Sequence, residues 1–224
     1  MVHLMETRTA DLAATIGGRV RHHRQARGWT LDQLAEAAGV SRRMLVNVEQ
    51  GAVNPSVGSL LRLGDALGVG LPALVEPPRG GPVTVIRIGD GAVLWSSEAG
   101  GRAVLVAATE APDVVELWDW SLGGGDRYAS EAHSAGTREL VHVLEGNLVV
   151  EAAGEQVTLR RGDAASFPGD LPHVYAAPDG PARFSLSVYE PGVGTGHGTQ
   201  THGSQTHGGQ THGSQTHRTG ADRA

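Results

Sequence analysis

The sequence predicts an α + β protein of two domains, a helical N-terminal domain followed by a β-rich one. Apolar side chains recur at helical spacing over residues 12–75, whereas residues 83–190 hold short β-rich runs separated by Gly, Pro, Asp or Asn. A stretch rich in Pro and Gly lies between them. The expected segments are a helical domain at 10–76, a linker at 77–82, a β domain at 83–191 and a tail at 192–224.

The composition limits the class of protein. A chain of 224 residues is long enough to bury a core in one or two domains. The absence of cysteine excludes a disulfide framework, a thiolate metal site and a cysteine nucleophile, and it is typical of a reducing compartment. No run of about 18 apolar residues occurs and the start lacks an apolar signal core, so we expect a cytoplasmic protein without a membrane partner.

The charge is unevenly distributed. The net charge of −6 by itself argues against a nucleic-acid partner, but residues 79–191 hold eight arginines against 16 acidic residues, whereas residues 1–78 hold eight against seven. Between positions 19 and 43 there are six arginines and only two acidic residues, Asp32 and Glu36. Such a face is suited to docking phosphate, although a solvated helix surface has the same pattern.

Turn and cap signals divide the helical domain into five helices. Thr30, Ser41 and Ser56 are suited to N-capping, and Gln33 stands where a capping box needs its partner for Thr30. Gly39 and Gly68 stand where helices end. The expected helices are one marked by Leu12, Ile16 and Val20 and ended by Arg27-Gly28, followed by 31–38, 42–50, 57–67 and 71–75.

The second and third helices have the spacing of a helix-turn-helix. The tight turn at 38–41 joins them, and in this motif the second helix enters the major groove of DNA. Arg42, Arg43 and Asn47 fall on the face opposite the apolar Leu45 and Val48. Arginine reads guanine edges and asparagine reads adenine edges. Helix N-termini are suited to phosphate oxygens.

This segment resembles the lambda-repressor-like, or XRE, family of DNA-binding domains over about residues 12–75. The resemblance implies a double-stranded DNA operator as partner, and it leaves open a helical domain that keeps the fold for protein contacts alone. By the resemblance Glu49 and Arg19 are structural, and the DNA-facing residues are Gln33, Ser41, Arg42, Arg43 and Asn47. It rests on Ile16-Gly-x-Arg19, Arg24, Trp29-Thr30-Leu31, Gln33-Leu34-Ala35, Gly39-Val40-Ser41, Val48-Glu49-x-Gly51 and Asn54-Pro55-Ser56.

Short apolar runs predict the strands of the β domain. Each run is four to nine residues of mostly β-branched, aromatic or alternating side chains. The expected strands are 83–88, 93–95, 103–107, 114–122, 140–144, 147–152, 156–159, 165–167, 173–176 and 183–189.

The β domain holds a candidate metal or effector pocket. Strand alternation places Glu139 on the face opposite His142, so His133, Glu139 and His173 can converge inside a barrel. Two imidazoles and a carboxylate at one open site suit Fe(II), Mn, Ni or Zn. Glu131 lies two residues before His133 and is a candidate fourth ligand.

Residues 105–190 resemble the cupin family, which implies a double-stranded β-helix barrel. The likeness rests on Glu139-(x)6-Gly146 and Gly162-(x)5-Pro168-(x)4-His173, but Glu131 replaces the family's first motif histidine and the gap from His133 to Glu139 is longer than usual. Two alternatives stay open: a divalent metal, or a metal-free pocket for a small organic effector. The candidate lining residues are Trp118, Phe167 and Tyr175.

The tail repeats with a period of five. Residues 197–217 place a histidine at the start of each Gly/Thr/Ser/Gln-rich unit. This composition cannot bury apolar surface, so we expect disorder. The five imidazoles suit weak binding of Ni, Zn or Cu, with no preformed site because the period matches neither a helix nor a strand.

Together these features favour a transcriptional regulator that acts as a homodimer, in which the cupin barrel binds a small molecule and supplies dimer contacts. The alternative is an enzyme, because some proteins with this domain order resemble mononuclear iron epoxidases. It would use His133, Glu139 and His173 as iron ligands. A third class is a DNA-tethered binding module without an effector.

Overall fold

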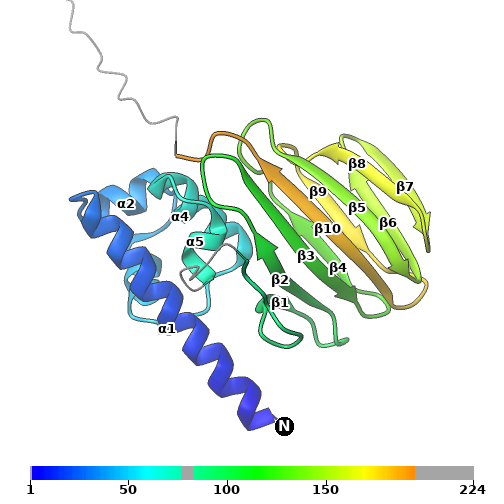
Figure 1. The fold of residues 1–224 in the computed structure, drawn as a ribbon, viewed down its shortest axis with the longest axis horizontal. Helices are drawn as coiled ribbons and strands as arrows, with labels where there is room; N and C mark the ends of the chain where they lie inside the picture. Colours follow the sequence, from blue (N-terminus) through cyan, green and yellow to red (C-terminus); the bar gives the residue numbers. More distant parts are fainter. Residues whose placement is uncertain (1, 77–82, 195–224) are drawn as a thin grey trace, which may run out of the picture.

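The computed structural model describes residues 2–76 and 83–194, and side chains from residue 10. The predicted linker at 77–82 and the repeats of the predicted tail therefore lie outside the described residues. Figure 1 shows the helices gathered at one side of the molecule and the strands at the other. The helices are α1 (Val2–Ala26), α2 (Leu31–Ala37), α3 (Arg42–Glu49), α4 (Val57–Leu67) and α5 (Leu71–Val75).

The predicted caps start and end the short helices. The Thr30 hydroxyl accepts from the Gln33 amide while the Gln33 side chain accepts from the Thr30 amide, so α2 begins with a full capping box. The Ser41 hydroxyl caps α3 by accepting from the Met44 amide, and the Ser56 hydroxyl caps α4 by accepting from the Ser59 amide. Gly68 ends α4 in the left-handed region at φ 60°. Helix α1 begins earlier than its apolar pattern indicated, at Val2.

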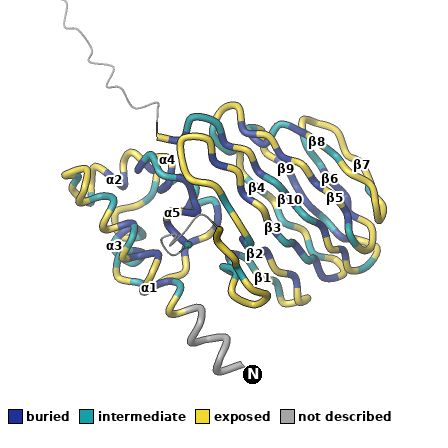
Figure 2. Tube along the Cα trace, in the orientation of Figure 1, coloured by how far each residue is buried: buried dark blue, intermediate teal, exposed yellow. Residues whose placement is uncertain are grey.

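The helical core lies between α1, α3 and α4. Leu45 and Val48 of α3 are fully buried, which confirms the predicted inward face of this helix, and Leu60 of α4 is buried with them. Figure 2 shows buried stretches of the chain in both the helices and the strands. A Cβ at Gly17 would collide with the Val48 carbonyl oxygen. A glycine at this position therefore lets α1 and α3 pack closely.

The C-terminal domain consists of two antiparallel sheets. One has the strand order β1-β2-β3-β10-β5-β8 and the other β4-β9-β6-β7. The strands are β1 (Ala92–Ser96), β2 (Arg102–Ala108), β3 (Val114–Leu122), β4 (Arg127–Ser130), β5 (Arg138–Glu145), β6 (Asn147–Ala152), β7 (Glu155–Arg160), β8 (Ala164–Pro168), β9 (His173–Ala176) and β10 (Ala182–Glu190). Five helices followed by antiparallel sheets of a cupin confirm the predicted fold class.

One predicted strand is absent from the structure, and one strand of the structure was not predicted. Residues 83–88 form no strand, and Val83, Val85 and Ile88 are exposed, because this apolar run has no neighbouring strand to pair with. Strand β4 was missed, because Tyr128 is its one large apolar side chain and gives no periodic signal. Its pairing with β9 places it in the sheet.

Aromatic rings fill the barrel. Trp120 of β3 stacks on Phe184 of β10, with the ring centroids 5.8 Å apart and an angle of 8° between the planes. It also packs against Tyr128 and Tyr175 from the opposite sheet. These rings connect the two sheets and form the base of a polar site.

Helix α4 faces the barrel. Arg62 pairs with Glu131, which follows β4, and the Ser134 hydroxyl donates to Asp65 at 3.0 Å. Val193 is buried and its amide donates to the Pro112 carbonyl at 2.6 Å, so residues 192–194 of the predicted tail still contact the folded domains. Among the described residues, no helix is long and apolar enough to cross a membrane.

Candidate functional site

The predicted DNA-binding residues lie on or beside α3. Arg42 and Arg43 are exposed on its first turn, and Asn47 is half-buried one turn later. The Arg42 guanidinium is 3.0 Å from the Asp32 carboxylate on α2 in a pair that is mostly exposed. These three side chains therefore lie on one accessible side of the helix.

The other two predicted DNA-binding residues cap helices. The Gln33 side chain belongs to the capping box of α2, and the Ser41 hydroxyl accepts from the Met44 amide at 3.1 Å. Both residues are exposed, so their remaining hydrogen-bonding capacity faces solvent at two helix N-termini.

A buried ion pair holds the end of α3 against α1. The Arg24 guanidinium contacts both carboxylate oxygens of Glu49, at 2.6 and 2.9 Å, and donates to the Trp29 carbonyl at 2.8 Å. The hydrogen bonds to Glu49 raise the pKa of Arg24. Glu49, for which a structural role was predicted, thus pairs with Arg24. Arg19, the other residue predicted to be structural, is half-buried on α1.

In the barrel, His133, Glu139 and His173 come together as the strand alternation predicted. Oε1 of Glu139 lies 2.9 Å from Nε2 of His133 and 3.2 Å from Nε2 of His173. One ligand atom of each residue lies within 4.8 Å of the others. His142 projects to the outer face and is exposed, as expected. Three potential ligands from three different segments therefore converge on one point.

The hydrogen bonds of this cluster constrain its protonation. Nδ1 of His173 lies 2.8 Å from the Leu171 carbonyl, which fixes the proton on Nδ1 and directs Nε2 at a carboxylate oxygen. Two acceptors face each other this way only when a proton or another cation lies between them. Accordingly, although burial alone lowers the pKa of His173, the hydrogen bond to Glu139 outweighs it and raises this pKa.

Glu139 is the centre of the cluster. Burial alone would raise its pKa, but hydrogen bonds with His133 and His173 lower the pKa to about 2. Its second oxygen accepts from the Tyr175 hydroxyl. Burial raises the pKa of Tyr128, which lies nearby, to about 12. The carboxylate is therefore ionised at neutral pH and the phenols around it are neutral.

Glu131 does not join the cluster. Its carboxylate is 75% exposed and pairs with Arg62 of α4 instead. The prediction from its spacing assumed that the side chain would turn into the barrel together with His133. The contact with the helical domain draws it outward, and sequence reasoning had no means of finding that contact.

Two buried carboxyl groups, both missed by the sequence analysis, lie near the cluster. Glu116 of β3 accepts from the Trp118 indole at 2.9 Å, and its Oε1 is buried without a partner. Burial raises the pKa of Glu116 well above its usual value and that of Glu190 to about 7. Both stand in the inward phase of their strands, a signal that strand alternation could have given.

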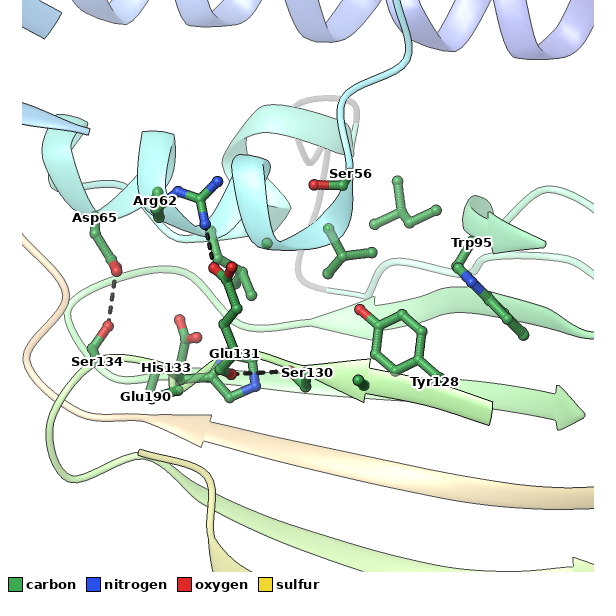
Figure 3. A pocket seen from close by; sticks show the side chains of 16 residues that line it. Ser56, Arg62, Asp65, Trp95, Tyr128, Ser130, Glu131, His133, Ser134 and Glu190 are labelled. Carbon is green, nitrogen blue, oxygen red and sulfur yellow. Dashed lines mark hydrogen bonds and ion pairs between the residues drawn. The ribbon is translucent and has the colours of Figure 1, made fainter. Parts of the chain in front are cut away.

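Two adjoining pockets lie between α4 and the barrel and share Val57, Leu61, Tyr128, Ser130 and His133 in their linings, so we describe them as the outer and inner parts of one cavity. The outer part has a volume of about 240 Å³, with Arg62 and Asp65 of α4 on one side and Tyr128 and His133 on the other (Figure 3). A smaller inner part, about 30 Å³, is lined by Glu116, Glu139 and aromatic rings. Of the predicted lining residues, Trp118 and Tyr175 line the inner part, whereas Phe167 is buried behind His173 and is not among the lining residues.

The cluster has the ligand types of a divalent metal site. His133 and His173 each direct a nitrogen at Glu139, and the Nδ1 hydrogen bond of His173 is the outer contact that metal-bound histidines commonly make. The cluster could thus hold a metal.

Comparison with known proteins supports the assignment of both domains. Residues 15–77 match the family described as a helix-turn-helix domain, and residues 118–189 match the family described as a cupin domain. The HTH-type transcriptional regulator SutR of Escherichia coli (strain K12) is 28% identical over 165 residues, which cover 74% of this chain and 88% of that protein.

Two further relatives cover different parts of the chain. The immunity repressor protein of Bacillus phage phi105 is 39% identical over 61 residues, 27% of this chain and 42% of that protein. A crystal structure of an HTH_3 family transcriptional regulator from Vibrio cholerae covers 82% of this chain and 99% of its own, with a TM-score of 0.62 and 24% identity, and shares the fold. This chain therefore carries an XRE-type helix-turn-helix domain followed by a cupin domain, and it is homologous to helix-turn-helix transcriptional regulators.

Proposed function

We propose that the chain binds an operator through α3 and that a small molecule in the cupin cavity controls this binding. The observation that carries the proposal is the position of the cavity, because its lining comes from both domains. Arg42, Arg43 and Asn47 would contact base edges, while Gln33 and Ser41 would contact phosphates. A regulator of this kind acts in the cytoplasm, where the operator is.

The role of α3 is tested by Arg43→Ala. An operator is first selected from a random DNA library, and its affinity is then measured for the variant and for the unaltered chain. We expect a loss of about 1–3 kcal/mol, because the variant lacks a contact to a base edge. The matched control is Arg160→Ala, which removes an exposed arginine from β7. Equal affinities for all three proteins would exclude Arg43 from the interface.

A homodimer fits both the operator and the barrel. Paired half-sites mirror the two-fold symmetry of the protein that reads them. On the outer face of the larger sheet, Val115 pairs with Tyr189 and Leu117 pairs with Ser187, so Val115, Leu117 and Tyr189 form an exposed apolar strip over β3 and β10. A second copy would cover this strip. Sedimentation equilibrium of Leu117→Asp should show monomers, with Val157→Asp on β7 as the control.

The pocket has two alternative forms in this proposal: one holds a divalent ion on His133, Glu139 and His173, and the other is a metal-free effector pocket. When bound, the ion would supply a Lewis-acid anchor for an oxygen atom of the effector. The chain itself would orient the His173 imidazole through the Leu171 carbonyl and exclude water with the surrounding rings.

The same cluster favours one second candidate, an iron oxygenase or epoxidase. Metal content separates the two when it is measured on a chain that ends at residue 194, because the histidines at 197–217 would bind metal themselves. The regulator predicts tight operator binding and no turnover. About one iron per chain, with substrate turnover and without salt-sensitive DNA binding, would support the enzyme.

A further inference from the structure

The roof of the cavity belongs to the DNA-binding domain. Val57 and Leu61 of α4 line both parts of the cavity, and Arg62 and Asp65 line the outer part. Figure 3 shows α4 above the end of β4, with the side chains of Glu131 and Ser134 directed at this helix. A molecule in the cavity thus contacts the helical domain and the barrel at once.

The inner end of the cavity contains polar atoms without partners. Oε1 of Glu116 and Nε1 of Trp120 are both buried and make no hydrogen bond among the described residues. Both side chains line the inner part, and both are almost fully buried. An unpaired buried acceptor is destabilising, so a donor placed against Glu116 would be stabilising.

The lining of the cavity holds more acidic than basic side chains. Arg62 pairs with Glu131, and the two histidines contact Glu139. Among the described side chains, those of residues 10–76 and 83–194, neither Glu116 nor Glu190 has an ion pair, and each is at most 2% exposed. A positive charge in the cavity would therefore be complementary to two buried carboxyl groups.

The walls of the cavity suit an organic cation. The rings of Trp118, Trp120, Tyr128 and Tyr175 line the inner part, and Trp95 lines the outer part. The faces of such rings attract ammonium groups. Leu61, Val57 and Leu94 provide apolar surface for a carbon chain. A hydrated inorganic ion would leave these apolar surfaces without a contact.

We propose that this cavity binds a small organic ammonium ion, whose charged group lies between Glu116, Glu190 and the aromatic rings and whose carbon chain lies beneath α4. The inference rests on the proposed effector function and adds the chemical class of the effector. Because α4 is also part of the helical core, the bound ion would hold the DNA-binding domain in one position on the barrel. Binding of the ammonium ion would change the affinity for DNA through its contact with α4.

Three ligands with one carbon skeleton test the class of effector. Calorimetric titration of the full chain with n-hexylamine, 1-hexanol and hexanoate varies only the charge of the head group. We expect n-hexylamine to bind at least tenfold more tightly than the other two. Hexanoate binding as tightly as the amine, or no binding by any of the three, would overturn the proposal.

The variant Glu116→Gln assigns the charged group. Its amide oxygen still accepts from Trp118, so the fold is preserved while the carboxylate is lost; thermal unfolding checks this. We expect at least a tenfold loss of n-hexylamine affinity with 1-hexanol unchanged. The control, Glu155→Gln, makes the same change on the exposed strand β7. An unchanged amine affinity in Glu116→Gln would refute the assignment, whereas the three-ligand comparison still decides the class if this variant fails to fold.

Operator binding measured on the same protein separates this inference from the proposed function. Operator binding without amine binding refutes the ammonium site and leaves the DNA-binding function standing. Amine binding that leaves operator affinity unchanged supports the site and refutes its regulatory role.

Discussion

Arg24 connects three parts of the helical domain through one guanidinium. It lies on α1, contacts Glu49 at the end of α3 and donates to the carbonyl of Trp29 before α2. The side chains of Arg24 and Glu49 are only 12% and 8% exposed. The position of the DNA-binding helix therefore depends on a pair that is shielded from water.

The variant Arg24→Ala should lower the free energy of unfolding by about 3–5 kcal/mol, because it leaves the Glu49 carboxylate buried without a counter-charge. Urea denaturation measures this loss. The control is Arg42→Ala, whose pair with Asp32 is exposed and should contribute no more than about 1 kcal/mol. Similar losses in the two variants would contradict a structural role for the Arg24–Glu49 pair.

Glu190 makes stability depend on pH. Its pKa of about 7 in the folded chain exceeds the usual 4.5, so the folded chain holds this proton more tightly than the unfolded one. Its contribution is full below pH 4.5 and is lost between pH 4.5 and 7, by about 3 kcal/mol. Glu190→Gln should therefore be more stabilising, relative to the parent, at pH 8 than at pH 4.

Chemical denaturation of both proteins at these two pH values measures the effect. The contribution of His173 to the free energy of unfolding changes in the same direction, because a raised pKa means that this contribution is lost as pH rises through the pKa. The difference between variant and parent reports the titration of Glu190 together with the change at Glu116, whose pKa the Glu190 charge raises. A difference that stays constant from pH 4 to pH 8 would show that the Glu190 carboxyl group titrates normally.

At the scale of elements, α4 has two packed faces. Leu60, Leu63 and Leu67 are buried in the helical core, whereas Arg62 and Asp65 bond to residues that follow β4. Movement of this helix on the barrel is therefore movement of the whole DNA-binding domain.

A cross-link can fix α4 to the barrel. The chain has no cysteine, so Asp65→Cys with Ser134→Cys introduces one defined pair at positions whose side chains are hydrogen-bonded. A short bis-maleimide should join them, and the locked protein should bind operator with an affinity that n-hexylamine no longer changes. Mass spectrometry and DNA titration measure both effects.

The control pair combines Asp65→Cys with Ser166→Cys, an exposed residue of β8, and should not cross-link. Efficient cross-linking of both pairs would mean that α4 does not keep this position on the barrel.

The elements differ in how far the sequence determined them. Caps such as Thr30 and Ser41 act on neighbouring amides, so the short helices could be predicted closely. Strand alternation also placed Glu139 inward. Residues 83–88 have the same alternation but no partner strand, and β4 has a partner but no pattern. Strand formation depends on pairing with distant segments, which a local pattern does not contain.

The candidate site could be predicted only in part, for the same reason. His133, Glu139 and His173 were found because one barrel brings its inward positions together. The pairing of Glu131 with Arg62 depends on how two domains pack, and their residues are 69 positions apart. The cavity beneath α4 could not be predicted, because its lining comes from both domains and the residues from each domain form no recognisable motif in the sequence.

At the scale of the whole molecule, the last described residues pack against the barrel. Val193 is 8% exposed and its amide bonds to Pro112. A chain that ends at Gly194 should keep the thermal stability of the full protein. Ending it at Pro191 should cost about 1.5–3 kcal/mol of unfolding free energy, because burial of the valine is lost. Calorimetry of the two truncations decides, and equal melting temperatures would contradict this role for Val193.

Gly194 lies directly against Gly68, the residue that ends α4. A Cβ on Gly194 would collide with the Gly68 carbonyl oxygen, and both glycines have positive φ angles. The chain therefore leaves the described structure at the junction between the domains. Any protein or dye fused after residue 194 would start at this junction, where it could serve as a built-in reporter of the angle between the DNA-binding domain and the barrel.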